Sequence, residues 1–303
     1  MTFWKEAMVR TEAEDFLKNL YCSPVELSDA LLMLAKNDWK ILAGGTDFYP
    51  SLQEAAPVGN VLDISKIAGL DQITLDDDGR WIIGARVTWT DVIEADLPQA
   101  FNALKLAARE VGSIQIQNRA TLIGNLCNAS PAADGVPPLL AMNAMVRLSC
   151  LNGEREVPLD DFIHGNRDTD LKCDEMVTHL IIPADGARGI SSFLKLGARK
   201  YLVISISMIA ARLSINESGL IDDAAISVGS CSAVAKRLDA LEKRLIGQDC
   251  QIDFAQLIEV DDLAPLSPID DVRASGDYRM IATKELVVRT LQNVIRERGN
   301  NGR

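Results

Sequence analysis

The chain has 303 residues but only two histidines, His164 and His179, and its six cysteines are widely separated in the sequence. No C-x-x-C pair occurs. Structural zinc sites and iron–sulfur clusters are commonly built from closely spaced cysteines or histidines. The sequence therefore excludes a metal centre encoded by local spacing, and it predicts free thiols in a reducing compartment.

Long hydrophobic runs are also missing. No stretch of about 18 apolar residues is present, which is the length that a membrane-spanning helix requires. Residues 1–6 lack the apolar core of a signal peptide. The net charge of −12 and the isoelectric point near 4.7 disfavour binding to nucleic acid or anionic lipid. These features predict a cytoplasmic protein with no membrane span and no nucleic-acid partner.

The common nucleotide-binding motifs are absent as well. The sequence contains neither G-x-G-x-x-G nor G-x-x-x-x-G-K-[ST] in its glycine-rich parts, so a Rossmann site and a P-loop are unsupported. Two other glycine-containing segments are present, at residues 42–47 and 118–125, and the second continues into residues 129–134. Glycine has no Cβ, so such segments can bring several backbone N–H groups close to one anion.

A Gly-Gly turn is more often structural than functional when it stands alone. The second segment strengthens the functional interpretation, because short polar side chains able to hydrogen-bond a cofactor follow it, namely Asn125, Asn128, Ser130 and Asp134. Two such segments in one chain predict a long, phosphate-bearing cofactor held from both sides.

The pattern along the first half alternates short strands and helices. Ser23 and Glu26 have the spacing of a capping box, which predicts an amphipathic helix over residues 23–36. Two hairpins are predicted from their turn residues, Asp78-Gly79 and Asn152-Gly153. The remaining predictions are strands at 39–43 and 61–64, and helices at 48–52, 90–95 and 100–111.

The pattern changes near residue 185. Residues 184–189 are small and polar, which is typical of a linker or domain boundary. Beyond them we expect a strand at 221–229, a helix at 236–246 and a final helix at 281–297. The sequence thus predicts a larger N-terminal portion and a smaller mixed lobe.

At the two glycine segments the chain resembles the FAD-binding medium subunits of molybdenum hydroxylases, the family of xanthine, carbon monoxide and nicotinate dehydrogenases. The resemblance covers almost the whole chain in order. Its motifs include Ala43-Gly44-Gly45-Thr46-Asp47, Gly124-Asn125-x-x-Asn128-Ala129-Ser130-Pro131-Ala132-Ala133-Asp134, Asp161-Phe162-x-x-Gly165-x-Arg167-x-Thr169-x-Leu171 and Phe193-x-Lys195-x-Gly197-x-Arg199.

This resemblance implies an α+β fold. Residues 1–185 would form a two-lobed FAD-binding domain of the vanillyl-alcohol-oxidase (PCMH) type, with the lobes dividing near residue 60. Residues 186–303 would form a C-terminal domain of the carbon monoxide dehydrogenase flavoprotein type, with a small antiparallel sheet and helices.

The resemblance also implies which residues hold FAD. Asp134 would accept hydrogen bonds from the ribityl or flavin end, Val177 would pack on the flavin, and Lys195 would lie near the isoalloxazine and favour its anionic reduced form. Val111 is a further expected contact. Backbone N–H groups of two loops would hold the diphosphate, and their residues are Leu42, Ala43, Gly44, Gly45, Thr46, Asp47 and Phe48, then Thr121, Gly124 and Asn125.

One residue departs from the family pattern. The second loop usually reads Thr-Ile-Gly-Gly-Asn, whereas here Ile123 precedes Gly124. If that position requires a positive φ or a close approach to the diphosphate, an isoleucine is costly. Either the loop has shifted or FAD binds more weakly.

The implied function is electron transfer. The chain would receive electrons from [2Fe-2S] clusters on a small partner subunit, which lie downstream of a molybdopterin cofactor on a large partner subunit. Its FAD would pass them to NAD, oxygen or another acceptor, and no catalytic or metal-binding residue is expected on this chain. Two alternatives stay open: a stand-alone FAD-dependent oxidoreductase of the same fold, and a non-catalytic partner subunit that has lost FAD.

Overall fold

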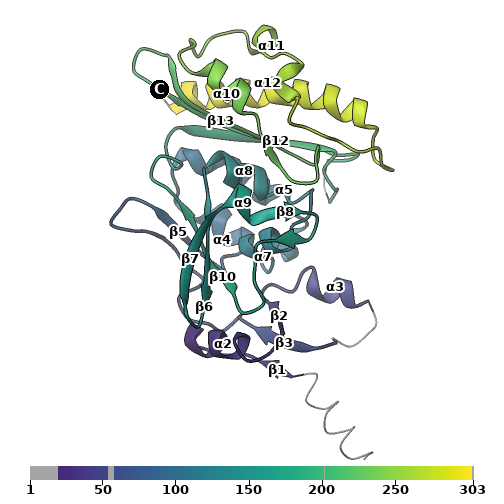
Figure 1. Cartoon of the computed structure of the whole chain (residues 1–303). Coiled ribbons are helices and arrows are strands. Elements are labelled where there is room, and N and C mark those ends of the chain that lie inside the picture. Colours follow the sequence, from purple (N-terminus) through teal and green to yellow (C-terminus); the bar gives the residue numbers. More distant parts are fainter. Residues whose placement is uncertain (1–19, 54–57, 201, 302–303) are drawn as a thin grey trace, which may run out of the picture.

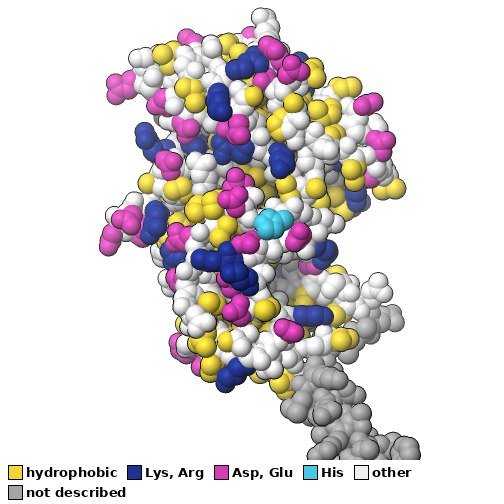
Figure 2. All heavy atoms as spheres, viewed as in Figure 1, with side chains coloured by type: hydrophobic (Ala, Val, Ile, Leu, Met, Phe, Trp, Pro, Cys, Tyr) yellow, Lys and Arg dark blue, Asp and Glu magenta, His cyan; other side chains and the backbone are white. Residues whose placement is uncertain are grey.

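The computed structural model describes residues 20–53, 58–200 and 202–301. Figure 1 shows three tiers: a small N-terminal lobe at the bottom, a sheet with covering helices in the middle, and a second large sheet at the top. Lys and Arg side chains are interspersed with Asp and Glu over the face drawn in Figure 2. No helix among the described residues is long and apolar enough to cross a membrane.

The N-terminal lobe is built on a parallel three-stranded sheet in the order β1-β3-β2. Parallel neighbours need a crossover connection, and α3 lies in the connection between the neighbouring strands β2 and β3, whereas α2 lies between β1 and β2. The elements are β1 (Tyr21–Cys22), α2 (Leu27–Leu34), β2 (Trp39–Leu42), α3 (Phe48–Leu52) and β3 (Asn60–Asp63). The predicted strands and the short helix are therefore present.

The predicted start of the first helix is wrong. The helix α2 begins at Leu27, its N-cap residue is Glu26, and no side chain caps it. The Ser23 hydroxyl is buried and has no hydrogen-bond partner among the described residues. The Val25 carbonyl instead accepts a hydrogen bond from the Ala68 N–H, with an N···O distance of 3.1 Å. This tertiary contact holds residues 23–26 outside the helix.

The middle tier contains an antiparallel five-stranded sheet in the order β4-β5-β10-β6-β7. Both predicted hairpins are confirmed, as β4 with β5 and β6 with β7. Gly79 adopts a φ of +75° in the first turn, which explains the glycine there. The strands are β4 (Ile73–Leu75), β5 (Trp81–Gly84), β6 (Met145–Cys150), β7 (Gly153–Pro158) and β10 (Met176–Ile182).

Short helices cover one face of this sheet. A complete capping box occurs at Thr88 and Asp91, at the start of α4. The predicted helix at 100–111 begins with a 3-10 turn. The helices are α4 (Trp89–Glu94), η1 (Gln99–Phe101), α5 (Asn102–Glu110), α6 (Ile114–Gln117), α7 (Leu122–Cys127), α8 (Val136–Ala141) and α9 (Leu159–Phe162). A hairpin of β8 (Ile163–Gly165) and β9 (Asp168–Thr169) follows α9.

The top tier is an antiparallel four-stranded sheet in the order β11-β12-β13-β14. The long helix α12 crosses one face, and α5 and α8 contact the other (Figure 1). The elements are β11 (Ile190–Leu196), β12 (Ser207–Ile215), β13 (Ile221–Gly229), β14 (Lys236–Arg237), α10 (Asp239–Leu245), α11 (Phe254–Leu257), η2 (Asp261–Leu263) and α12 (Gly276–Asn301). Residues 236–237 were predicted as helix, but they pair with β13 as a strand.

Small side chains join the top and middle tiers. On the face of the sheet toward α5 and α8, the buried contacts are mostly alanines: Ala103 and Ala107 of α5, Ala141 of α8, Ala210 of β12 and Ala225 of β13, with Phe193 and Met208. We call these five alanines the alanine seam. The predicted α+β class with an antiparallel C-terminal sheet is confirmed.

Candidate cofactor-binding site

A cavity of about 410 Å³ lies where the N-terminal lobe meets the middle tier. Its lining combines the end of β2, the loop into α3, the start of α7 and β10. It brings together most of the predicted site residues, namely Leu42, Ala43, Gly44, Gly45, Thr46, Asp47, Phe48, Val111, Thr121, Gly124, Asn125 and Val177. Asp134 and Lys195 are not part of the lining.

The first loop, residues 43–48, presents its backbone to the cavity. The strand β2 ends at Leu42, whose carbonyl accepts from the Ile64 N–H at 2.9 Å. The chain then turns through Gly45, which adopts a φ of +74°. None of the N–H groups of residues 43–48 donates to another group among the described residues. The loop therefore offers a row of unused donors.

Gly44 brings the first loop against the second. A Cβ at this position would overlap the carbonyl oxygen of Arg119. The residue is thus required for a close backbone contact between the loops, whatever it contributes to ligand approach.

The second loop, residues 121–125, uses most of its donors internally. Thr121 is the N-cap of α7, and its Oγ1 accepts from the Gly124 N–H at 3.1 Å. The N–H groups of Leu122 and Asn125 donate to the carbonyls of Val87 and Thr121, at 3.0 and 3.1 Å. This segment is therefore the start of a capped helix, in which three of the five N–H groups are already engaged.

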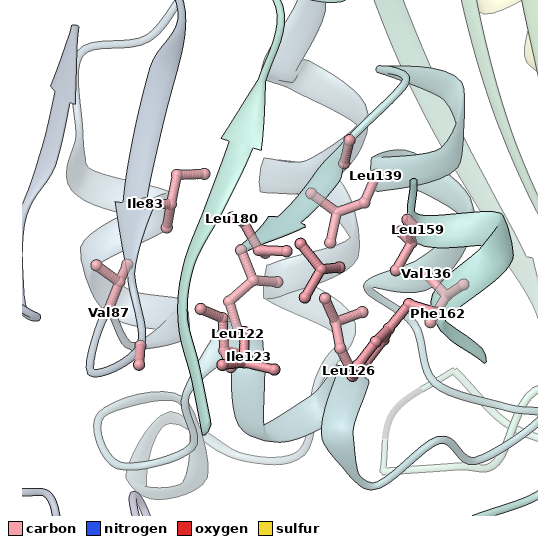
Figure 3. Close-up of a cluster of buried hydrophobic side chains, with 14 of the residues drawn as sticks. Ile83, Val87, Leu122, Ile123, Leu126, Val136, Leu139, Leu159, Phe162 and Leu180 are labelled. Atoms are coloured by element: carbon pink, nitrogen blue, oxygen red, sulfur yellow. The ribbon is translucent and has the colours of Figure 1, made fainter. Parts of the chain in front are cut away.

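Ile123 fits this helix start without backbone strain. It lies inside α7 and does not adopt a positive φ. Its side chain is 4% exposed and packs in the main core, beside Leu122 and Leu126 in Figure 3. The loop conformation does not require glycine at this position, which removes the backbone reason for expecting a shifted loop.

Much of the cavity wall is apolar and comes from residues that sequence reasoning did not assign to the site. Trp89 is fully buried, and Leu171 lies on the segment before β10. Burial raises the pKa of the Cys127 thiol to about 12, so it is neutral near pH 7 and is not an activated nucleophile. Further unassigned lining residues are Ile41, Ser51, Ile64, Ala85, Ile116 and Ala120. Asn128, one of the polar side chains expected to hydrogen-bond a cofactor, also lines the cavity.

Asp134 and Lys195 pair with each other. The Lys195 Nζ lies 2.8 Å from Asp134 Oδ2, and the Ser205 hydroxyl donates to Asp134 Oδ1 at 2.9 Å. Both side chains are buried, and desolvation raises the pKa of the Asp134 carboxyl against the opposing effect of Lys195. Asp134 lies in the loop before α8 and Lys195 lies in β11, so the pair links the middle and top tiers.

An ion pair lies at the rim of the cavity. The Arg167 Nη1 is 3.5 Å from Asp47 Oδ2, and both side chains are more than half exposed. Arg167 adopts a φ of +58° at the tip of the β8–β9 hairpin, and its N–H donates to the Ala129 carbonyl at 2.9 Å. This backbone contact holds the hairpin tip against the segment after α7.

The arrangement suits a diphosphate attached to a flat ring. The unused N–H row can donate to phosphate oxygens, and the apolar wall can enclose an aromatic ring system. Among the described lining residues, Asp47 is the only charged side chain, and no carboxylate–histidine or carboxylate–carboxylate pair is present. The geometry therefore fits FAD and gives little support to acid–base catalysis.

Comparison with known proteins gives two family matches. Residues 12–185 match the FAD binding domain in molybdopterin dehydrogenase, and residues 192–294 match the CO dehydrogenase flavoprotein C-terminal domain. Together they cover most of the chain, and the first alone covers more than half of it.

Individual relatives carry related names. The chain is 29% identical over 276 residues to the nicotine 6-hydroxylase medium subunit of Paenarthrobacter nicotinovorans, covering 89% of this chain and 95% of that protein. It is 32% identical over 212 residues to the nicotinate dehydrogenase FAD-subunit of Eubacterium barkeri, covering 68% and 71%. A solved carbon monoxide dehydrogenase from Hydrogenophaga pseudoflava aligns with a TM-score of 0.80 at 26% identity, covering 91% and 96%.

Proposed function

Because the chain belongs to the FAD-binding medium subunits of the molybdenum hydroxylases, we propose that it carries electrons between partner subunits and a soluble acceptor. Substrate oxidation would take place at a molybdopterin cofactor on a large subunit, and [2Fe-2S] clusters on a small subunit would deliver the electrons. NAD is the acceptor we propose first, with oxygen as the alternative.

The row of unused N–H groups at residues 43–48 carries this proposal. FAD exchanges electrons singly or in pairs, which suits a carrier between one-electron clusters and a two-electron acceptor. The chain's own residues then have three tasks: the first loop binds the diphosphate, the apolar wall including Trp89 and Val177 excludes water, and α7 keeps the second loop rigid. None of these tasks requires a proton-transfer residue.

We further propose the division of the chain and the roles of the buried pair. Residues 1–185 form the FAD-binding domain, with its lobes dividing near residue 60, and residues 186–303 form the C-terminal domain. The family matches at 12–185 and 192–294 support this division. The family resemblance supports a role for Asp134 and Lys195 at the flavin end, although neither residue lines the cavity. They would act as one paired unit, because the Lys195 ammonium lies 2.8 Å from the Asp134 carboxylate.

The geometry disfavours both alternatives. A stand-alone oxidoreductase would carry its own catalytic acid and base, and the described lining residues contain one carboxylate, Asp47, with no histidine, lysine or second carboxylate. The non-catalytic alternative rested on the cost of Ile123, and that residue is accommodated in a regular helix.

The test is purification of the native complex, followed by identification of its subunits and extraction of its cofactors. We expect one FAD for each copy of this chain, together with a molybdopterin-binding subunit and an iron–sulfur subunit. The flavin absorbance should bleach when a substrate of the complex is added, and NAD should restore it. An intact complex that contains no FAD would overturn the proposed function.

A further inference from the structure

The charge of the cavity does not match the charge of a diphosphate. Asp47 is the only charged side chain among the described residues that line it, and it is acidic. The diphosphate of FAD carries two negative charges near pH 7, so a carboxylate beside it is unfavourable. Backbone N–H groups supply partial positive charge, and a cationic counterion for the carboxylate would reduce its repulsion with the diphosphate.

Arg167 is placed to supply that counterion. Its guanidinium lies 3.5 Å from the Asp47 carboxylate, although the two residues come from different lobes of the chain. The hydrogen bond from the Arg167 N–H to the Ala129 carbonyl, at 2.9 Å, fixes the tip of the β8–β9 hairpin beside the cavity rim. Arg167 also keeps the left-handed backbone conformation, with a φ of +58°, that this position requires.

The other arginines near the first loop line a neighbouring pocket. Arg86 and Arg119 lie there together with Thr88 and Asn118, and the pocket shares Ala43, Gly44 and Thr121 with the cavity. Among the described residues, Asp47 forms its ion pair with Arg167 and not with either of these arginines. Arg86 is already engaged by the Ile67 carbonyl and lies 3.6 Å from Asp71.

We propose that Arg167 is a cofactor-binding residue: it neutralises Asp47 and balances the charge of the diphosphate at the cavity rim. The inference rests on the proposed function, since it assumes that FAD occupies the cavity. Removing the guanidinium leaves the Asp47 carboxylate unpaired beside a dianion, so both the lost attraction and the gained repulsion weaken binding. Removing both charges restores part of the affinity, because the repulsion disappears with the carboxylate.

The experiment compares FAD with riboflavin, which lacks the diphosphate. The purified complex is stripped of flavin, and dissociation constants are measured by fluorescence titration for the unchanged complex, R167Q, R167K, D47N and the R167Q/D47N double variant. We expect R167Q to weaken FAD binding about tenfold at low ionic strength, and the loss to shrink as salt is added. R167K should keep most of the affinity, D47N should bind FAD more tightly than the unchanged complex because the repulsion is removed while Arg167 stays, and the double variant should bind better than R167Q. Riboflavin binding should be unchanged throughout.

A matched control is available on α12. Arg289 and Glu285 form an ion pair with an Nε···Oε1 distance of 2.7 Å and similar exposure, far along the chain from the cavity. R289Q should leave both titrations unchanged. If the R167Q complex binds FAD as tightly as the R289Q complex does, the inference is wrong while the proposed function stands. The same holds if R167Q weakens riboflavin binding as much as it weakens FAD binding. If the unchanged complex binds neither flavin, the proposed function fails and the inference fails with it.

Discussion

Two loops, predicted at residues 42–48 and 121–125, were expected to hold the same diphosphate with their backbone N–H groups. In the structure, the first loop (43–48) and the second loop (121–125) differ. The first loop leaves all its backbone N–H groups unbonded among the described residues. In the second loop, Leu122, Gly124 and Asn125 all donate to groups within the protein. A ligand can recruit donors from the first loop without breaking a hydrogen bond among the described residues, whereas recruiting those of the second requires breaking existing bonds.

The difference shows that a glycine can serve packing as well as ligand approach. Gly44 is required because the Arg119 carbonyl lies against it, and Gly124 because the Thr121 hydroxyl lies 2.7 Å from where its Cβ would be. The first loop thus provides the N–H donors and packs closely at Gly44 against the segment before the second loop. The second loop is the capped start of α7. Four measurements can break or sharpen this division.

The largest effect should follow from Ile123→Gly, which restores the glycine that the family usually has. Ile123 is 4% exposed in the core, and it lies in a helix. We expect a loss of about 4 kcal/mol in unfolding free energy, from the buried side chain and from the glycine in a helix. Denaturant titration measures this loss, and FAD affinity should fall with it.

Ile123→Val is a smaller truncation at the same position. It should lower the unfolding free energy by about 1 kcal/mol and leave the FAD affinity unchanged. If Ile123→Gly instead tightened FAD binding without loss of stability, the second loop would function like the first, and the contrast drawn above would be wrong.

The next effect should come from Gly44→Ala. The added Cβ overlaps a backbone carbonyl that cannot rotate away, so the two loops must separate. We expect about 3 kcal/mol of destabilisation together with loss of bound FAD, measured by thermal unfolding and by flavin absorbance. Gly299→Ala is the control, since nothing lies within 4 Å of that position in α12. Equal behaviour of the two variants would refute the contact between the loops.

Hydrogen exchange can compare the loops directly. Removing FAD from the complex should speed exchange of the amides at 43–48 at least about tenfold, equivalent to about 1.4 kcal/mol. The amides of Leu122, Gly124 and Asn125 should change much less, because their acceptors belong to the protein. Mass spectrometry with overlapping peptides resolves the two segments. Equal deprotection of both loops would show that both are recruited by the ligand.

The smallest effect should come from the helix cap. Thr121→Ala removes the acceptor of the Gly124 N–H and should cost about 1 kcal/mol, whereas Thr121→Ser should retain most of that stability. Thr46→Ala is the matched change in the first loop, where the side chain makes no hydrogen bond among the described residues. Its unfolding midpoint should not move. A larger loss from Thr46→Ala than from Thr121→Ala would reverse the assignment of the two roles.

Features encoded by consecutive residues were predictable. The hairpin turns at Gly79 and Gly153, the short helix at residues 48–52 and the first glycine loop all depend on local backbone chemistry, and all are present. The motifs also identified the family, which the match over residues 12–185 confirms.

Features that depend on distant contacts were not predictable. Ser23 has the spacing of a capping box, but a contact between Val25 and Ala68 prevents it. The apolar wall of the cavity was missed because Ile41, Trp89 and Leu171 have the character of ordinary core residues. The Asp134–Lys195 pair joins residues 61 positions apart, and no local pattern indicates it.

The alanine seam between the middle and top tiers constrains how this chain can evolve. Where the contact consists of side chains such as Ala141, Ala210 and Ala225, each substitution by a larger residue adds volume to a fully buried contact. Compensation would require a simultaneous reduction on the opposite side, and an alanine there can only be reduced to glycine, so Phe193 and Met208 are the side chains of this contact with most volume to lose. A C-terminal sheet taken from a diverged relative would therefore fit this N-terminal part best if its own small residues fell at the same positions.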